Sequence, residues 1–144
     1  MPTIQVSIGE SKELLPALFK SGSSNSWITS RAAKECQLKI EPLAEGRIVL
    51  DEFTKKPLMA NELAGIAHVK MNIAGNNMEM DMIVVIDELS DFSLALGMDF
   101  VSQFASYMLD SKLFIEFVGE KGQSFKVPYT IGAGCLGGFK LVHV

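Results

Sequence analysis

Residues 15–29 of this 144-residue chain read LPALFKSGSSNSWIT, and this stretch decides the fold. Residues 15–19 are apolar throughout and predict a short strand, which Pro16 interrupts. Residues 21–26 are all small or polar and predict a tight loop. Lys20 therefore stands where a buried strand enters a loop, and the apolar sequence resumes directly after that loop.

Two short helices are expected elsewhere in the chain. Thr29 or Ser30 can cap a helix over residues 31–37, which are rich in Ala, Lys and Glu. Asp99 can cap a second helix over residues 100–105. Both predicted helices are too short to form the core alone.

A hairpin is the clearest two-stranded pattern. Residues 69–73 alternate between apolar and polar, residues 74–77 predict a turn, and residues 78–82 return with methionine at every second position. Such methionines could indicate a soft-metal site, but period-two spacing in a hairpin favours a sheet face packed on the core. Residues 83–86 lose the alternation and predict a strand buried on both faces.

The rest of the chain also favours short strands. Residues 48–50 and 58–67 form two expected arms around the polar tip at 51–57. Further strands are expected at 3–8, 14–19, 106–109, 113–118 and 125–131, the last of these completing the sheet. Many short strands with two short helices predict an all-β domain with a closed, barrel-like sheet.

Composition excludes several classes of function. With 48% hydrophobic and 21% charged residues, the chain is expected to fold as one domain around one core. A net charge of −4 and a single local basic pair, Lys55 and Lys56, argue against nucleic-acid binding. The apolar runs are too short to span a bilayer, and residues 1–8 do not resemble a signal peptide. We therefore expect an intracellular protein, cytoplasmic or nuclear.

The sequence contains no pattern for a cofactor, a metal or nucleophilic catalysis. Cys36 and Cys135 are expected to be reduced thiols, and no CxxC pair indicates zinc. His68 and His143 lie outside any nucleophile-elbow pattern. Residues 132–137 match G-x-G-x-x-G, but only seven residues follow, so the helix that this motif requires cannot form.

Three features in fixed order resemble the retropepsins, the half-sized aspartic proteases of retroviruses and LTR retroelements. The strand and loop of residues 15–29 are similar to the family's apolar-apolar-x-Asp-Ser/Thr-Gly segment. The hairpin and buried strand over 69–86 come next, and LALGMDF at 94–100 is similar to the family's Ile-Leu-Gly-Met-Asp-Trp segment. The resemblance implies a retropepsin-like barrel with a flap hairpin over residues 1–131. Residues 132–144 would then be a Gly-rich tail or linker.

In retropepsins, one loop from each of two chains meets its copy on a two-fold axis, where paired aspartates share a proton and activate water. The resemblance therefore implies a homodimer whose cleft takes an extended peptide, and it places Lys20 where the catalytic aspartate stands. The implied residues fall into a degenerate active-site loop (Lys20, Ser21, Gly22, Ser23), a loop-packing group (Leu96, Gly97, Asp99) and a flap (Asp51, Phe53, Lys55, Lys56).

Lys20 is incompatible with the aspartate mechanism. An ammonium group has no lone pair with which to accept a proton from water. Two such charges about 4 Å apart would repel by about 4 kcal/mol at an effective dielectric constant of 20. The lysines would then be neutral, turn outward to solvent or shift the dimer. No aspartate in the chain is followed by Ser/Thr-Gly, so none can replace the missing one.

The leading hypothesis is a catalytically inactive retropepsin-like domain of retroelement origin. It would serve as a homodimerisation or peptide-binding module in a larger intracellular protein. Hydroxyls of Ser21 and Ser23 would bond across the axis, and the terminal strands would pair between chains. The alternatives are an active peptidase subunit paired with an intact Asp-Ser-Gly chain, Lys20 as an engineered inactivating change, and a monomeric interaction domain.

Overall fold

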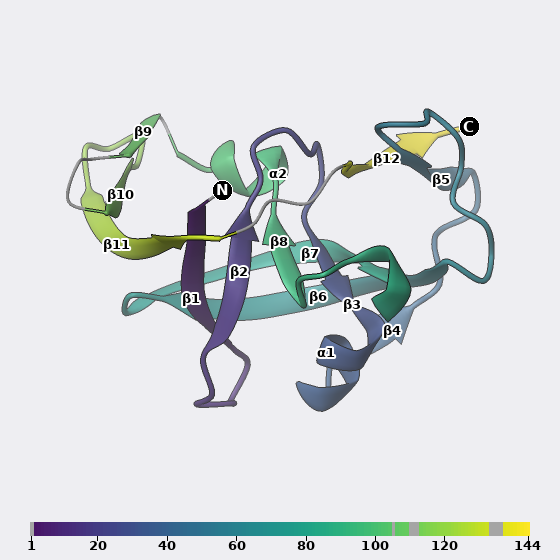
Figure 1. The fold of residues 1–144 in the computed structure, drawn as a ribbon, viewed down its shortest axis with the longest axis horizontal. Helices are drawn as coiled ribbons and strands as arrows, with labels where there is room; N and C mark the ends of the chain where they lie inside the picture. The colour runs from purple at the N-terminus through teal and green to yellow at the C-terminus, as the bar shows by residue number, and fades with distance from the viewer. Residues whose placement is uncertain (1, 105, 110–112, 133–136) are drawn as a thin grey trace.

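The computed structural model describes residues 2–104, 106–109, 113–132 and 137–144 (Figure 1). The strands are β1 (Pro2–Ile8), β2 (Leu15–Phe19), β3 (Trp27–Thr29), β4 (Ile40–Glu41), β5 (Arg47–Asp51), β6 (Leu63–Ile73), β7 (Asn76–Val85), β8 (Leu94–Leu96), β9 (Ser106–Leu109), β10 (Phe114–Val118), β11 (Ser124–Ile131) and β12 (Phe139–His143). The helices are α1 (Ser30–Glu35), α2 (Met98–Val101) and the 3-10 turn η1 (Asp87–Leu89). None of the described helices is long and apolar enough to cross a membrane.

The main sheet closes on itself. Its strand order is β4-β6-β7-β3-β8-β2-β1-β11-β10-β9, and β1 also pairs with β6. That pairing joins Ser7 to Asn72 and Ile8 to Met71, so β6, β7, β3, β8, β2 and β1 form a closed ring. The pairs β2–β8 and β3–β7 are parallel and the others antiparallel. The predicted all-β, closed-barrel fold is confirmed.

Residues 82–85 show why the end of strand β7 lacks an apolar–polar alternation. Met82 and Val84 belong to the larger core cluster, whereas Ile83 and Val85 pack into a second cluster with Trp27. All four side chains are buried, so both faces of this part of β7 are covered. The prediction of a strand buried on both faces over 83–86 is confirmed for 83–85, whereas Ile86 follows β7 and is only partly buried.

The β6–β7 hairpin turns through two residues. Ile73 pairs with Asn76, and the intervening Ala74 and Gly75 have φ values of 50° and 86°. Two consecutive positive φ values match the twist of the flanking strands. Along β7, Met78 and Met80 pack against the core, as expected for a sheet face.

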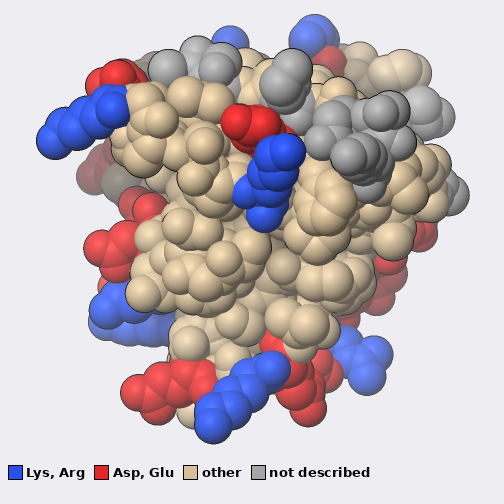
Figure 2. All heavy atoms as spheres, turned by 90° about the vertical axis from the view of Figure 1, so that its left-hand side faces the viewer, with Lys and Arg blue, Asp and Glu red and all other residues tan. Residues whose placement is uncertain are grey.

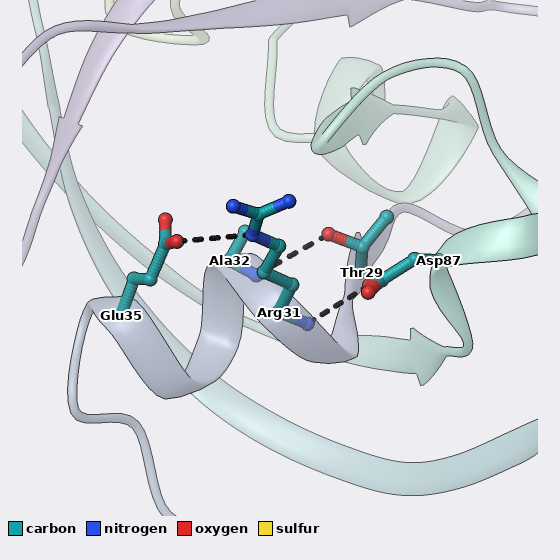
Figure 3. Close-up of polar contacts among 5 residues, drawn as sticks. All are labelled: Thr29, Arg31, Ala32, Glu35 and Asp87. Atoms are coloured by element: carbon teal, nitrogen blue, oxygen red, sulfur yellow. Dashed lines mark hydrogen bonds and ion pairs between the residues drawn. The ribbon is translucent and has the colours of Figure 1, made fainter.

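Helix α1 begins one residue earlier than predicted. Thr29 is its N-cap, and its hydroxyl accepts a hydrogen bond from the Ala32 amide at 3.3 Å (Figure 3). The Arg31 amide, which as part of the first turn has no partner within the helix, donates to the Asp87 carboxylate at 3.0 Å. Side chains from two segments therefore satisfy the start of this six-residue helix.

Three boundaries differ from the prediction. Helix α2 begins at Met98 with Gly97 as N-cap, so the prediction that Asp99 caps the helix is wrong; residue 105 of the predicted helix lies outside the described residues. The second arm after the polar tip becomes a strand only at Leu63. The chain does not end its strands at β11, because β12 follows within the expected tail. Residues 133–136 of that tail lie outside the described residues.

Candidate functional site

The loop that follows β2 is held at its first residue. The Lys20 amide donates to the Leu96 carbonyl at 2.8 Å, which extends the parallel β2–β8 pairing by one bond. The Ser23 amide donates back to the Lys20 carbonyl at 3.2 Å and closes a tight turn. Lys20 is only 5% exposed, so its side chain does not extend into solvent in the single chain. Ser21 and Gly22 are exposed at the tip of the turn.

The start of α2 packs directly against this loop. The Met98 amide donates to the Ser23 carbonyl at 2.7 Å, and the Asp99 amide donates to the Ser24 carbonyl at 3.1 Å. A Cβ atom at Gly97 would lie 2.6 Å from the Ser23 carbonyl oxygen and 2.8 Å from that of Asn25. Only glycine fits between these backbone oxygens.

Asp99 holds the far end of the loop. Its two carboxylate oxygens accept from the Ser26 amide at 2.9 and 3.0 Å. The Ser26 hydroxyl donates to the same carboxylate at 2.6 Å and accepts from the Gly97 amide at 2.9 Å. Ser26 is completely buried, so these bonds satisfy a hydroxyl that water does not reach. Asp99 also accepts from the Phe100 amide at 2.8 Å. This carboxylate is therefore occupied as a structural acceptor.

The polar tip after β5 folds toward the loop. Asp51 accepts from the amides of Phe53 and Thr54 at 2.8 and 3.0 Å and thereby closes the tip on itself. The Glu52 carboxylate accepts a short hydrogen bond from the Ser24 amide. Phe53 is 74% exposed, and Lys55 and Lys56 are also exposed. Of the predicted flap residues, Asp51 supports the tip and the other three face solvent.

This arrangement agrees with a known family. The family model described as retroviral aspartyl protease matches residues 11–118, which include the loop, the tip, the hairpin and α2. The chain belongs to the retroviral aspartyl protease family. No curated protein matches it.

A solved structure gives the same fold. The retroviral protease-like domain of Ddi1 from Leishmania major superposes with a TM-score of 0.63 at 20% sequence identity. The alignment covers 91% of this chain and 94% of that chain. At this identity the likeness supports the retropepsin-like fold and carries no residue role across.

The predicted loop and loop-packing residues of this protease-family domain are neighbours in the structure. Lys20 and Ser23 of the loop bond to Leu96 and Met98, while Gly97 and Asp99 contact residues 23–26. The predicted flap meets the loop through Glu52, a residue that the sequence analysis did not select. Glu52 is one of four charged residues in the tip, and nothing in the neighbouring sequence indicates that it bonds to another loop.

A second group of site residues was also missed. Strand β12 lies between the loop and β5: its register pairs Phe139 with Asp51 and His143 with Arg47. On the other edge, the Asn25 amide donates to the Phe139 carbonyl at 3.0 Å, and the Phe139 amide donates to the Ser23 hydroxyl at 3.1 Å. Ser23 is completely buried, and its hydroxyl donates to the Asn25 carbonyl at 2.8 Å. The Ser23 hydroxyl therefore bonds within the single chain, and its expected bond across a two-fold axis stays a prediction.

His68 and Cys36 lie away from this site. His143 belongs to β12 and pairs with Arg47 through its backbone. His68 is half-exposed on β6 and bonds Asp81 at 2.8 Å and Glu79 at 3.3 Å across the hairpin. These two hydrogen bonds, first that to Asp81, raise the pKa of His68. Burial raises the pKa of the Cys36 thiol, which forms no disulfide. Cys135 lies outside the described residues. Within the described part of the chain, no group of His, Cys, Asp and Glu side chains could hold a metal ion.

Proposed function

We propose that this domain is a catalytically inactive member of the family that serves as a binding module. The observation that carries the proposal is Lys20, which directly follows β2; by the resemblance of residues 15–24 to the family motif, this is the place of the catalytic aspartate. An ammonium at this position cannot act as the general base, and it would keep a neighbouring carboxylate charged. The shared proton of an aspartate pair would then be lost.

Three described carboxylates around the loop and the tip are already engaged as acceptors. Asp99 contacts the loop, but its oxygens are taken up by Ser26 and Phe100. Asp51 accepts from the tip backbone. Glu52 reaches the Ser24 amide and is bound there. Each of these three described acids therefore has a structural task, and this supports a binding role over peptidase activity.

The homodimer that the family resemblance implies would need a contact outside the terminal strands. In the single chain, β1 pairs with β2, β11 and β6, and β12 pairs with β5. The exposed apolar side chains Tyr107, Leu109, Leu113 and Ile131 belong to the β9–β11 end of the molecule. That end lies at the left of Figure 1, and Figure 2 shows this face as mostly uncharged, with one basic side chain next to an acidic one just above its centre. We place a two-fold contact, as part of the proposal, at this end.

A peptidase assay tests the proposed loss of activity. The wild-type chain, incubated with a mixed peptide library from acid to neutral pH, is expected to leave every peptide uncut. Cleavage that pepstatin inhibits would refute the proposal. The matched variant Lys20→Asp restores a carboxylate at the same position, and any cleavage gained by it alone would identify Lys20 as the cause of inactivity. Sedimentation velocity of the wild type across micromolar concentrations reports whether the dimer forms.

A further inference from the structure

The most informative unassigned feature is β12, which lies outside the residues that match the family model. Residues 138–143 pass between β5 on one side and residues 23–25 on the other, and we call the space that they fill the β12 site. In Figure 1 this short strand lies beside β5, at the end of the molecule opposite to β9–β11.

The contacts of β12 are those of an extended peptide. Its backbone bonds on both edges: the Glu52 amide donates to the Gly138 carbonyl at 2.9 Å on the β5 side. The Leu141 amide donates to the Asn25 side-chain oxygen at 2.9 Å on the loop side. Strand addition of this kind takes its affinity from the main chain, while alternate side chains provide specificity.

Three positions within residues 138–143 define the chemistry of the site. At Gly138, a Cβ atom would lie 2.8 Å from both Cβ and Oγ of Ser23, so no side chain fits. Phe139 is buried and packs edge-on against Trp27, with ring centroids 5.0 Å apart. Leu141 packs against the same cluster beside a pocket of about 310 Å³. Lys140 between them is exposed. The contacts therefore favour glycine, an aromatic residue, any residue and an aliphatic residue, in that order.

We propose that residues 138–143 are a built-in occupant of the β12 site, and that the site exchanges this strand for an extended Gly-aromatic-x-aliphatic segment of a partner protein. The inference rests on the binding role proposed above and names the chemistry of the ligand. A tethered strand has an effective concentration on the order of millimolar, so a free peptide competes poorly until the strand is displaced.

The test uses the full chain and the labelled peptide GFKLVHV, which copies residues 138–144. Gly138→Ala places a methyl group against Ser23 and displaces β12 without altering the site itself. Fluorescence anisotropy should show the peptide binding this variant at least about tenfold more tightly than the wild type. The peptide AFKLVHV should bind neither protein. Lys140→Ala, an exposed change on the same strand, should behave as wild type.

Equal weak binding of GFKLVHV to the wild type and to a folded Gly138→Ala variant would overturn the inference, as would equal binding of the two peptides. If circular dichroism shows that Gly138→Ala has lost its fold, Leu141→Ser replaces it with the same expected direction. A folded variant that dimerises by exchanging β12 between copies, seen by sedimentation, would also refute a partner segment as the occupant. None of these outcomes depends on peptidase activity, so failure here is distinguishable from failure of the proposed inactivity.

Discussion

Two glycines contact the same loop, one at its backbone oxygens and the other at the Ser23 side chain, and they belong to different parts of the fold. Gly97 lies at the junction of β8 and α2, and an added Cβ would meet the backbone oxygens of Ser23 and Asn25. Gly138 precedes β12, and its Cβ would meet the Ser23 side chain. The first contact is built into the closed barrel through β8, whereas the second involves a strand that, among the described residues, pairs with β5 and the loop and lies outside the main sheet. The same steric change should therefore unfold the domain in one case and release a strand in the other.

The largest effect is expected for Gly97→Ala. The obstructing atoms are backbone oxygens 2.6 and 2.8 Å away, and the loop that carries them is fixed by Asp99 and Leu96. Overpacking against atoms that cannot move should lower the free energy of unfolding by about 3 kcal/mol. Urea denaturation followed by circular dichroism measures this loss.

Gly22→Ala is the matched control for this change. Gly22 lies in the same loop and is exposed, and an added Cβ would have nothing within 4 Å. We expect its stability to lie within about 0.5 kcal/mol of wild type. A Gly97→Ala variant as stable as Gly22→Ala would show that the loop is not held as the contacts indicate.

A smaller and local effect is expected for Gly138→Ala. The contact at Ser23 should free β12 while leaving the barrel folded, because β12 adds no strand to the closed ring. The amides of Phe139 and Leu141, now bonded to Ser23 and Asn25, should exchange with deuterium at least about tenfold faster. Amides of β6 and β7 should keep their wild-type rates. Uniformly faster exchange through all strands would mean that the Gly138 contact, like the Gly97 contact, is needed to keep the whole domain folded.

The sequence could predict the elements that neighbouring residues determine, and it could not predict those that depend on distant partners. Residues 15–19 and the hairpin around Ala74 and Gly75 follow from local patterns, because the strand period and the turn are set by neighbouring residues. The start of α2 was misplaced because Asp99, in a position typical of a cap, instead accepts from Ser26, 73 residues away. Strand β12 was missed because five residues after a Gly-rich stretch give little pattern, and its partner β5 lies about ninety residues earlier.

The smallest effect is expected at His68, which lies away from the loop. There, exposed carboxylates of the hairpin can be compared with the enclosed carboxylate of Asp99. His68 lies on the open face of the β6–β7 hairpin, where its hydrogen bonds to Asp81 and Glu79 raise its pKa. A histidine whose pKa is raised by folding stabilises the folded state fully below its unfolded pKa of about 6.5. This contribution disappears as the pH rises through the higher pKa of the folded state.

His68→Gln should therefore lower Tm slightly at acid pH and leave it unchanged at alkaline pH. The difference should shrink in high salt, because exposed pairs are screened. Differential scanning calorimetry of both proteins across pH measures it, with His143→Gln as the control that lacks the carboxylate pair in the described structure. A Tm difference that grows with rising pH would contradict the sign. Asp99, in contrast, holds a buried hydroxyl and a backbone amide within the loop, so the loop depends on enclosed hydrogen bonds and the hairpin face does not.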